Sequence, residues 1–119
     1  ERESVFDGYL RRINELAVSA ASEAGMTVDI EEIERFPATE NHPENADKVR
    51  ECACRLGMEV EELSEPMRWS EDFGWYLMKT NGSFFGIGDG EGYAQLHTKD
   101  YEFPDVIMEN AVRVFAQLI

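Results

Sequence analysis

His97 is the side chain of this sequence best suited to chemistry. It is one of only two histidines, and it follows the glycine-rich turn "GIGDGEG" at 86–92. A neutral imidazole is a common zinc ligand, and α/β proteins place their sites in loops at strand ends. A histidine in a loop is more often simply exposed, however, and zinc needs three or four ligands. His42, the other histidine, lies in a connector, so a site with several histidines is excluded. A metal site built from His97 and carboxylates remains possible, but the sequence shows no characteristic ligand spacing for it.

The stretch "SEDF" at 70–73 has two readings. Ser70 suits the N-cap of a helix, and Glu71 and Asp72 then lie in the first turn, where the helix dipole favours negative charge. Alternatively, Glu71 or Asp72 lies at a cleft and supports a metal-ligating residue. Motifs of zinc proteases, nucleotide-binding loops and serine nucleophile elbows are absent from the sequence.

The two cysteines do not add a metal site. Cys52 belongs to an apolar stripe of a predicted helix, and Cys54 lies about 200° further around that helix. The two thiols therefore face different directions, and we expect both to be free in a reducing cytosol.

Helices and strands alternate along the chain and must position these residues. Hydrophobic periodicity and the caps Ser4, Asn41 and Gly57 predict helices at 4–24, 43–56, 71–80 and 104–118, strands at 27–36, 58–63 and 83–88, and a loop at 88–103. The inward residues of the last helix are expected to be Ile107, Met108, Ala111, Val112, Phe115 and Leu118. Such alternation predicts an α/β fold with layered helices on a mixed sheet.

Composition limits the classes of partner. The net charge is −14, which argues against nucleic acid and against anionic membranes, since both require a basic surface. No apolar run approaches the ~18 residues of a membrane span, and no secretory leader is visible. We therefore expect a cytoplasmic protein that binds neither nucleic acid nor membrane.

Three motifs in register give a family resemblance. They are "MRWSEDFGWYL" at 67–77, "GSFFGIGDGEG" at 82–92 and "LHTKDYEFPD" at 96–105, with "FPATENHPE" upstream at 36–44. In this order they resemble the C-terminal end of the metal-dependent aminoacylase and carboxypeptidase-type peptidases and amidohydrolases, in the subgroup of hippurate hydrolase, auxin-conjugate hydrolases and N-acyl-amino-acid deacetylases. The resemblance implies that residues 1–37 are the last helix and strand of a lid or dimerisation domain. Residues 38–119 would be the C-terminal part of a zinc-peptidase-like catalytic domain.

The same resemblance implies a role for each candidate residue. Family members hydrolyse an amide bond at a two-metal centre, commonly zinc, with a glutamate as general base. The histidine of the Leu-His motif is a metal ligand in the family, which maps to His97. The residues expected to line or support the site are Ser70, Glu71, Asp72, Gly86 and Gly88. The family's other ligands and its general base have no counterpart here, so no catalytic residue is assigned and tight metal binding by this chain alone is not expected.

Three hypotheses follow from these observations. The chain is the C-terminal piece of an enzyme that cleaves N-acyl amino acids or small peptides, inactive without a missing N-terminal catalytic segment. Alternatively, it is a non-enzymatic α/β module of that descent that self-associates or binds a partner, because an incomplete sheet leaves open edges. A third possibility is an unrelated small α/β binding protein.

Overall fold

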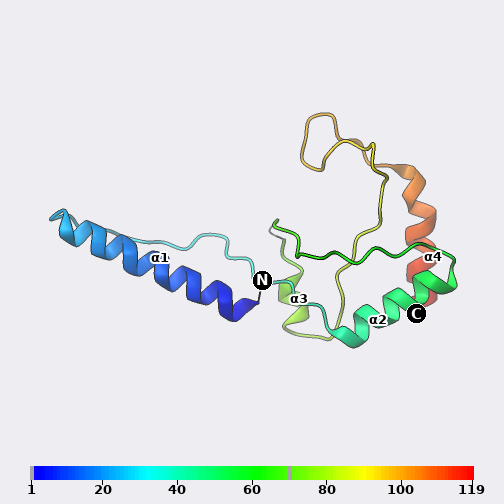
Figure 1. The fold of residues 1–119 in the computed structure, drawn as a ribbon, viewed down its shortest axis with the longest axis horizontal. Coiled ribbons are helices and arrows are strands. Elements are labelled where there is room, and N and C mark those ends of the chain that lie inside the picture. The colour runs from blue at the N-terminus through cyan, green and yellow to red at the C-terminus, as the bar shows by residue number, and fades with distance from the viewer. Residues whose placement is uncertain (1, 70) are drawn as a thin grey trace. The chain divides into compact units, whose positions relative to one another are not determined.

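The computed structural model describes residues 2–69 and 71–119. The elements are α1 (Glu3–Glu23), α2 (Pro43–Arg55), α3 (Gly74–Leu77), the 3₁₀ helix η1 (Asp105–Ile107) and α4 (Met108–Leu118) (Figure 1). The chain divides into two compact units. The first comprises Glu1–Asn41 and Leu63–Gly82, and the second comprises His42–Glu62 and Ser83–Ile119.

The predicted sheet is wrong, because no described residue belongs to a β-strand. The segments 27–36, 58–63 and 83–88 are non-helical, and none has a ladder of backbone hydrogen bonds to a neighbour. A strand exists only when a second segment pairs with it, whereas a helix satisfies its backbone within one segment. In 83–89 exposure still alternates residue by residue from Phe84 onward, as it would on a sheet. The local pattern is therefore present without the pairing that the fold class requires.

α1 begins one residue earlier than expected, and Ser4 does not cap it. The N-cap is Arg2, which makes no side-chain cap hydrogen bond, and Ser4 lies inside the helix. The first turn is held instead by Glu3, whose backbone N–H donates to Glu40 Oε1 at 2.8 Å. The C-terminus is as predicted: Gly25 has φ of +67°, and Met26 donates to Ala21 O at 2.8 Å, which forms a Schellman motif.

The segment after Gly25 runs back along α1 in the first unit (Figure 1). Arg35 fixes its return: Nη2 donates to Glu3 Oε1 at 2.7 Å and also to Asp7, and the guanidinium lies 5.3 Å from the Phe6 ring centroid. The hydrogen bonds to Glu3 and then Asp7 raise the pKa of Arg35 above its ordinary value. Ile33, nearby, remains 73% exposed, so this return covers α1 only in part.

A tight joint connects this return segment to α3. Pro37 is buried, and Gly74, the first residue of α3, is buried beside it. A Cβ at Gly74 would lie 2.8 Å from Pro37 O and 2.9 Å from Ala38 O, closer than real Cβ atoms approach. The Ala38 N–H donates to Glu3 Oε2 at 2.6 Å, which ties the same turn to α1. We call Pro37, Ala38, Thr39, Glu71 and Gly74 the joint.

α3 is shorter than the sequence predicts. It ends at Leu77 rather than near Asn81, and its N-cap is Phe73. Hydrophobic periodicity predicts that Phe73, Tyr76 and Leu77 face inward; Leu77 is buried, but Tyr76 is 61% exposed. The predicted cap Ser70 lies outside the described residues.

The second unit is built on α2 packed against α4. Cys52 is 1% exposed and its thiol donates to Val114 O at 3.5 Å, while Val114 is 4% exposed. Phe85 adds a ring contact with Phe115, at 5.7 Å between centroids. α2 starts as predicted around Pro43, although His42 rather than Asn41 is its N-cap, and Gly57 ends it with φ of +72°.

The buried face of α4 differs from the predicted one. Val114 is buried and Ile107 and Ala111 are half-buried, whereas Val112 and Phe115 are 64% and 55% exposed. The helix carries apolar residues on more than one side, and α2 covers only the side of Val114. Periodicity identified an amphipathic helix, but it could not choose which apolar face packs against α2.

Candidate functional site

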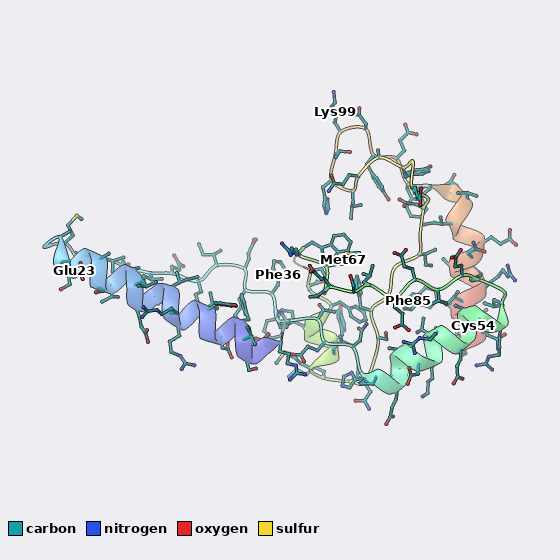
Figure 2. All side chains as sticks on the ribbon, viewed as in Figure 1. Glu23, Phe36, Cys54, Met67, Phe85 and Lys99 are labelled. Carbon is teal, nitrogen blue, oxygen red and sulfur yellow. The ribbon has the colours of Figure 1, made fainter. Side chains whose placement is uncertain are left out.

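Successive tight turns carry His97 in the second unit. Backbone hydrogen bonds run from Tyr93 N to Gly90 O (3.4 Å), from Thr98 N to Gln95 O (3.2 Å) and from Tyr101 N to Thr98 O (3.2 Å). This is the irregular segment that the sequence predicts as a loop, and Lys99 marks its outer part in Figure 2. The side chain of His97 is exposed. The loop therefore leaves the imidazole accessible.

The backbone of His97 is left-handed, with φ of +65°. It occupies the third position of the turn 95–98, and the second position, Leu96, does not have a positive φ. That pattern is typical of a type II turn, which normally places Gly or Asn where this chain has His. Non-glycine residues in this conformation are uncommon, and they cluster at functional sites.

Gly86 and Gly88 lie in open surroundings. In the described part of the chain, a Cβ at either position would meet no heavy atom within 4 Å, and neither glycine has a positive φ. Gly90, in contrast, has φ of +99° and needs to be glycine for its turn. Neither backbone conformation nor packing among the described residues explains why positions 86 and 88 carry glycine.

Glu71 is a structural support within the joint. One carboxylate oxygen accepts a hydrogen bond from the Thr39 hydroxyl, and the other accepts from the Phe73 N–H at 2.6 Å. Glu71 is half-buried, while Asp72 is exposed and its backbone carbonyl accepts from Trp75 N at 3.0 Å. The structure thus gives Glu71 a bracing role and gives Asp72 a place at the start of α3.

Two hydroxyl residues were missed by the sequence analysis. Thr39 is the partner of Glu71, and Thr98 donates its hydroxyl to Gln95 O at 2.7 Å. Thr98 carried a usable signal, because Ser and Thr commonly bond the backbone in turns. Thr39 carried none, since its partner is 32 residues away.

No complete metal centre exists among the described residues. No group of three or more His, Cys, Asp or Glu side chains converges there. Cys52 is buried and Cys54 is exposed, so the two thiols have different surroundings. His97 can therefore serve as a single ligand at most within this part of the chain.

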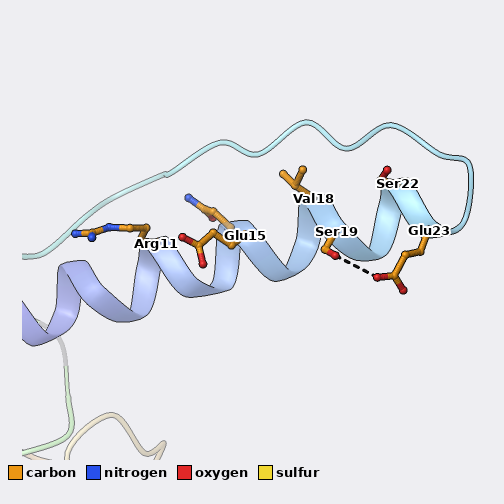
Figure 3. Close-up of a pocket in the computed structure, with 7 residues that line it drawn as sticks. Arg11, Glu15, Val18, Ser19, Ser22 and Glu23 are labelled. Carbon is orange, nitrogen blue, oxygen red and sulfur yellow. Dashed lines mark hydrogen bonds between the residues drawn. The ribbon is translucent and has the colours of Figure 1, made fainter.

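Two concave surfaces in the described part of the chain are open, and neither is lined by a histidine or a cysteine. One lies along the side of α1, and Figure 3 shows Ser19 on it donating to Glu23, a bond of 3.2 Å. A smaller one lies in the loop, between Tyr93, Asp100 and Glu102. Among the described helices, none is both long and apolar enough to cross a membrane.

Comparison with known proteins assigns the family. The model of Peptidase family M20/M25/M40 matches residues 5–119. The chain belongs to this family. The M20/M25/M40 match includes the joint and the His97 loop, and it confirms the resemblance drawn from the three motifs. The family is one of hydrolases that are generally metal-dependent.

A curated relative is similar over most of the chain. It is the N-acetyldiaminopimelate deacetylase of Streptococcus sanguinis (strain SK36), which is 32% identical over 91 residues. The alignment covers 75% of this chain and 24% of the relative, so the chain spans about a quarter of the length of the curated relative that it matches. No solved structure matches the chain significantly.

Proposed function

We propose that this chain is the C-terminal part of a metal-dependent amidohydrolase that cleaves N-acyl amino acids or small peptides. The observation that carries the proposal is His97, an exposed imidazole at a left-handed turn inside the region matched by the hydrolase family. The deacetylase relative supports an N-acyl amino acid as the substrate class. Zinc is the metal that we expect.

In this proposal the chain contributes one ligand and part of the site wall. A bound metal would lower the pKa of water and polarise the substrate carbonyl. His97 would hold that metal through one ring nitrogen. The open backbone at Gly86 and Gly88 would leave room for substrate or for the rest of the catalytic domain. Glu71 would keep the joint rigid rather than bind metal, since both of its oxygens already accept hydrogen bonds.

The remaining ligands and the general base would come from an N-terminal catalytic segment. We propose residues 1–37 as lid and 38–119 as catalytic domain, with no activity from this chain alone. The short coverage of the deacetylase relative and the lack of a metal cluster among the described residues both support this division of labour. By the same reasoning, the isolated chain should retain little or no zinc.

The test uses the complete protein, meaning this chain joined to the catalytic segment that the proposal requires. His97→Ala should lower zinc affinity by more than about hundredfold, because loss of outer partners of a ligand alone typically costs 10–100-fold. Hydrolysis of N-acetyl amino acids, N-acetyldiaminopimelate first, should fall with it. His42→Ala is the matched control, and it should keep both zinc and activity. Unchanged zinc affinity in His97→Ala would refute the proposal.

A second candidate is a module that associates with itself or with a partner. The observation that favours it is exposed apolar side chains in each unit: Leu16 and Ile33 in the first and Phe115 in the second are all more than half exposed. Exposed apolar surface of this kind commonly marks a site of association. Size-exclusion chromatography with light scattering on the isolated chain tests it, and a monomer at all concentrations would count against it.

A further inference from the structure

The conformation of His97 requires something to hold it. L-residues avoid the left-handed region because Cβ then approaches the following carbonyl oxygen, and His lacks glycine's freedom. His97 nevertheless has φ of +65°, in an exposed loop where no buried packing forces it. Among the described residues, the restraint next to His97 is the pair of hydrogen bonds that closes its turn.

Thr98 supplies that restraint twice. Its backbone N–H donates to Gln95 O at 3.2 Å, and its hydroxyl donates to the same oxygen at 2.7 Å. The hydroxyl bond is the shorter of the two, so the side chain reinforces the closure that defines the turn. Leu96 and His97 lie between the two ends of the turn, so both bonds narrow the range of conformations that these two residues can adopt.

We propose that Thr98 is the positioning residue for His97. Thr98 acts through His97 and does not itself touch metal or substrate. This proposal rests on the proposed role of His97 as a metal ligand. A left-handed residue directs its side chain differently from an extended or right-handed one, so the turn selects where the imidazole points. A ligand held in its binding geometry before the metal arrives binds more tightly, since little ordering remains to be done.

The variants separate the hydroxyl from the shape of the side chain. Thr98→Val keeps the branched shape and removes the donor, and Thr98→Ser keeps the donor and removes only a methyl group. Thr80→Val is the matched control, because Thr80 is an exposed threonine in the other unit. None of these changes touches His97 itself.

The first measurement needs no metal and uses the 119-residue chain. In a type II turn the Leu96 Hα lies close to the His97 N–H, which gives a strong nuclear Overhauser effect. Thr98→Val should weaken that effect, whereas Thr98→Ser and Thr80→Val should retain it. A signal of unchanged strength in Thr98→Val would overturn the proposal.

The second measurement is zinc affinity of the complete protein, by competition with a chromophoric chelator. Thr98→Val should weaken zinc binding about tenfold, in the range typical for residues that orient a ligand. Thr98→Ser should restore the affinity, and Thr80→Val should match the unaltered protein. Equal weakening in Thr98→Val and Thr98→Ser would indicate general damage to the loop and would overturn the proposal.

His97→Ala tells the two possible failures apart. If His97→Ala weakens zinc binding and Thr98→Val does not, the ligand stands and the role of Thr98 fails. If His97→Ala leaves zinc binding unchanged, the proposed function fails first, and the role of Thr98 in metal binding fails with it.

Discussion

The joint and the His97 loop both lie in the part of the sequence that the family model matches, but different kinds of contact hold them. In the joint, Gly74 lies against Pro37 and Glu71 bonds to Thr39, so residues more than thirty positions apart fix one another. In the loop, the bonds link residues only three apart, as between Gln95 and Thr98, and Gly86 and Gly88 are open.

This difference separates residues whose types are explained by the fold of the chain from residues whose types are not. The joint is complete within the first unit, so its glycine and its carboxylate have sufficient structural reasons. The loop has glycines without a local reason and a histidine in a conformation that costs free energy. We expect the residues that contacts within the chain do not explain to face metal, substrate or the rest of the catalytic domain.

Gly74→Val is the strongest test of the comparison. The added side chain would meet Pro37 O and Ala38 O, and overpacking of this kind typically costs up to about 3 kcal/mol of the free energy of unfolding. Gly86→Val is the matched control, expected within about 0.5 kcal/mol of the unaltered chain. Urea unfolding followed by tryptophan fluorescence suits the pair, because Trp75 is adjacent to Gly74. Equal destabilisation by both variants would remove the distinction between joint and loop.

Val114→Ala tests the other closed region, the packing of α4 on α2. Val114 is 4% exposed, so deletion of two methyl groups should cost about 2 kcal/mol of the free energy of unfolding. Val112→Ala, on the same helix but 64% exposed, should change it by less than about 0.5 kcal/mol. Urea unfolding monitored by circular dichroism measures both. A larger effect at Val112 would restore the buried face that the sequence predicts.

Glu71→Gln is expected to have a smaller effect. The amide oxygen can still accept from Phe73 N, but the NH2 group can only donate to the Thr39 hydroxyl, so two charge-assisted bonds are replaced by weaker neutral ones. The loss should be about 1 kcal/mol of the free energy of unfolding. A double-mutant cycle with Thr39→Val measures the interaction free energy between the two side chains. Asp72→Asn is the exposed control. Additive effects of Glu71→Gln and Thr39→Val would show that the two side chains are not coupled.

The sequence predicted what is local. α1, α2 and α4 were found to within a few residues, because an amphipathic helix carries its period and its stop signals, such as Gly25 and Gly57, within one segment. The extended segments had the right pattern, yet strands need partners, and none pairs in the described chain. The start of α1 was missed for a similar reason: the carboxylate of Glu3 is used by Ala38 and Arg35, far away in sequence.

The candidate site was predicted only as far as its motifs reach. The family followed from three motifs in order, and the family match confirms it. The role of His97 and the domain boundary at 37 stay predictions. The bracing by Glu71 could not be predicted from the sequence, because it depends on Thr39. The left-handed backbone of His97 could not be predicted either, because histidine does not indicate that conformation as glycine does.

Gly86→Ala and Gly88→Ala should have the smallest effect on stability and a larger effect on activity. In the isolated chain each should change the free energy of unfolding by less than about 0.5 kcal/mol, since among described atoms the new methyl group meets nothing. In the complete protein the same methyl groups would lie where substrate or the rest of the catalytic domain must approach, so hydrolysis of N-acetyl amino acids should fall at least about tenfold, a loss of about 1.4 kcal/mol in transition-state stabilisation. A stability loss in the isolated chain would mean that the glycines serve the local fold. Unchanged activity in the complete protein would mean that the space beside them is not used. Only the combination of unaffected stability and lost activity fits glycines whose purpose lies outside the chain's own contacts.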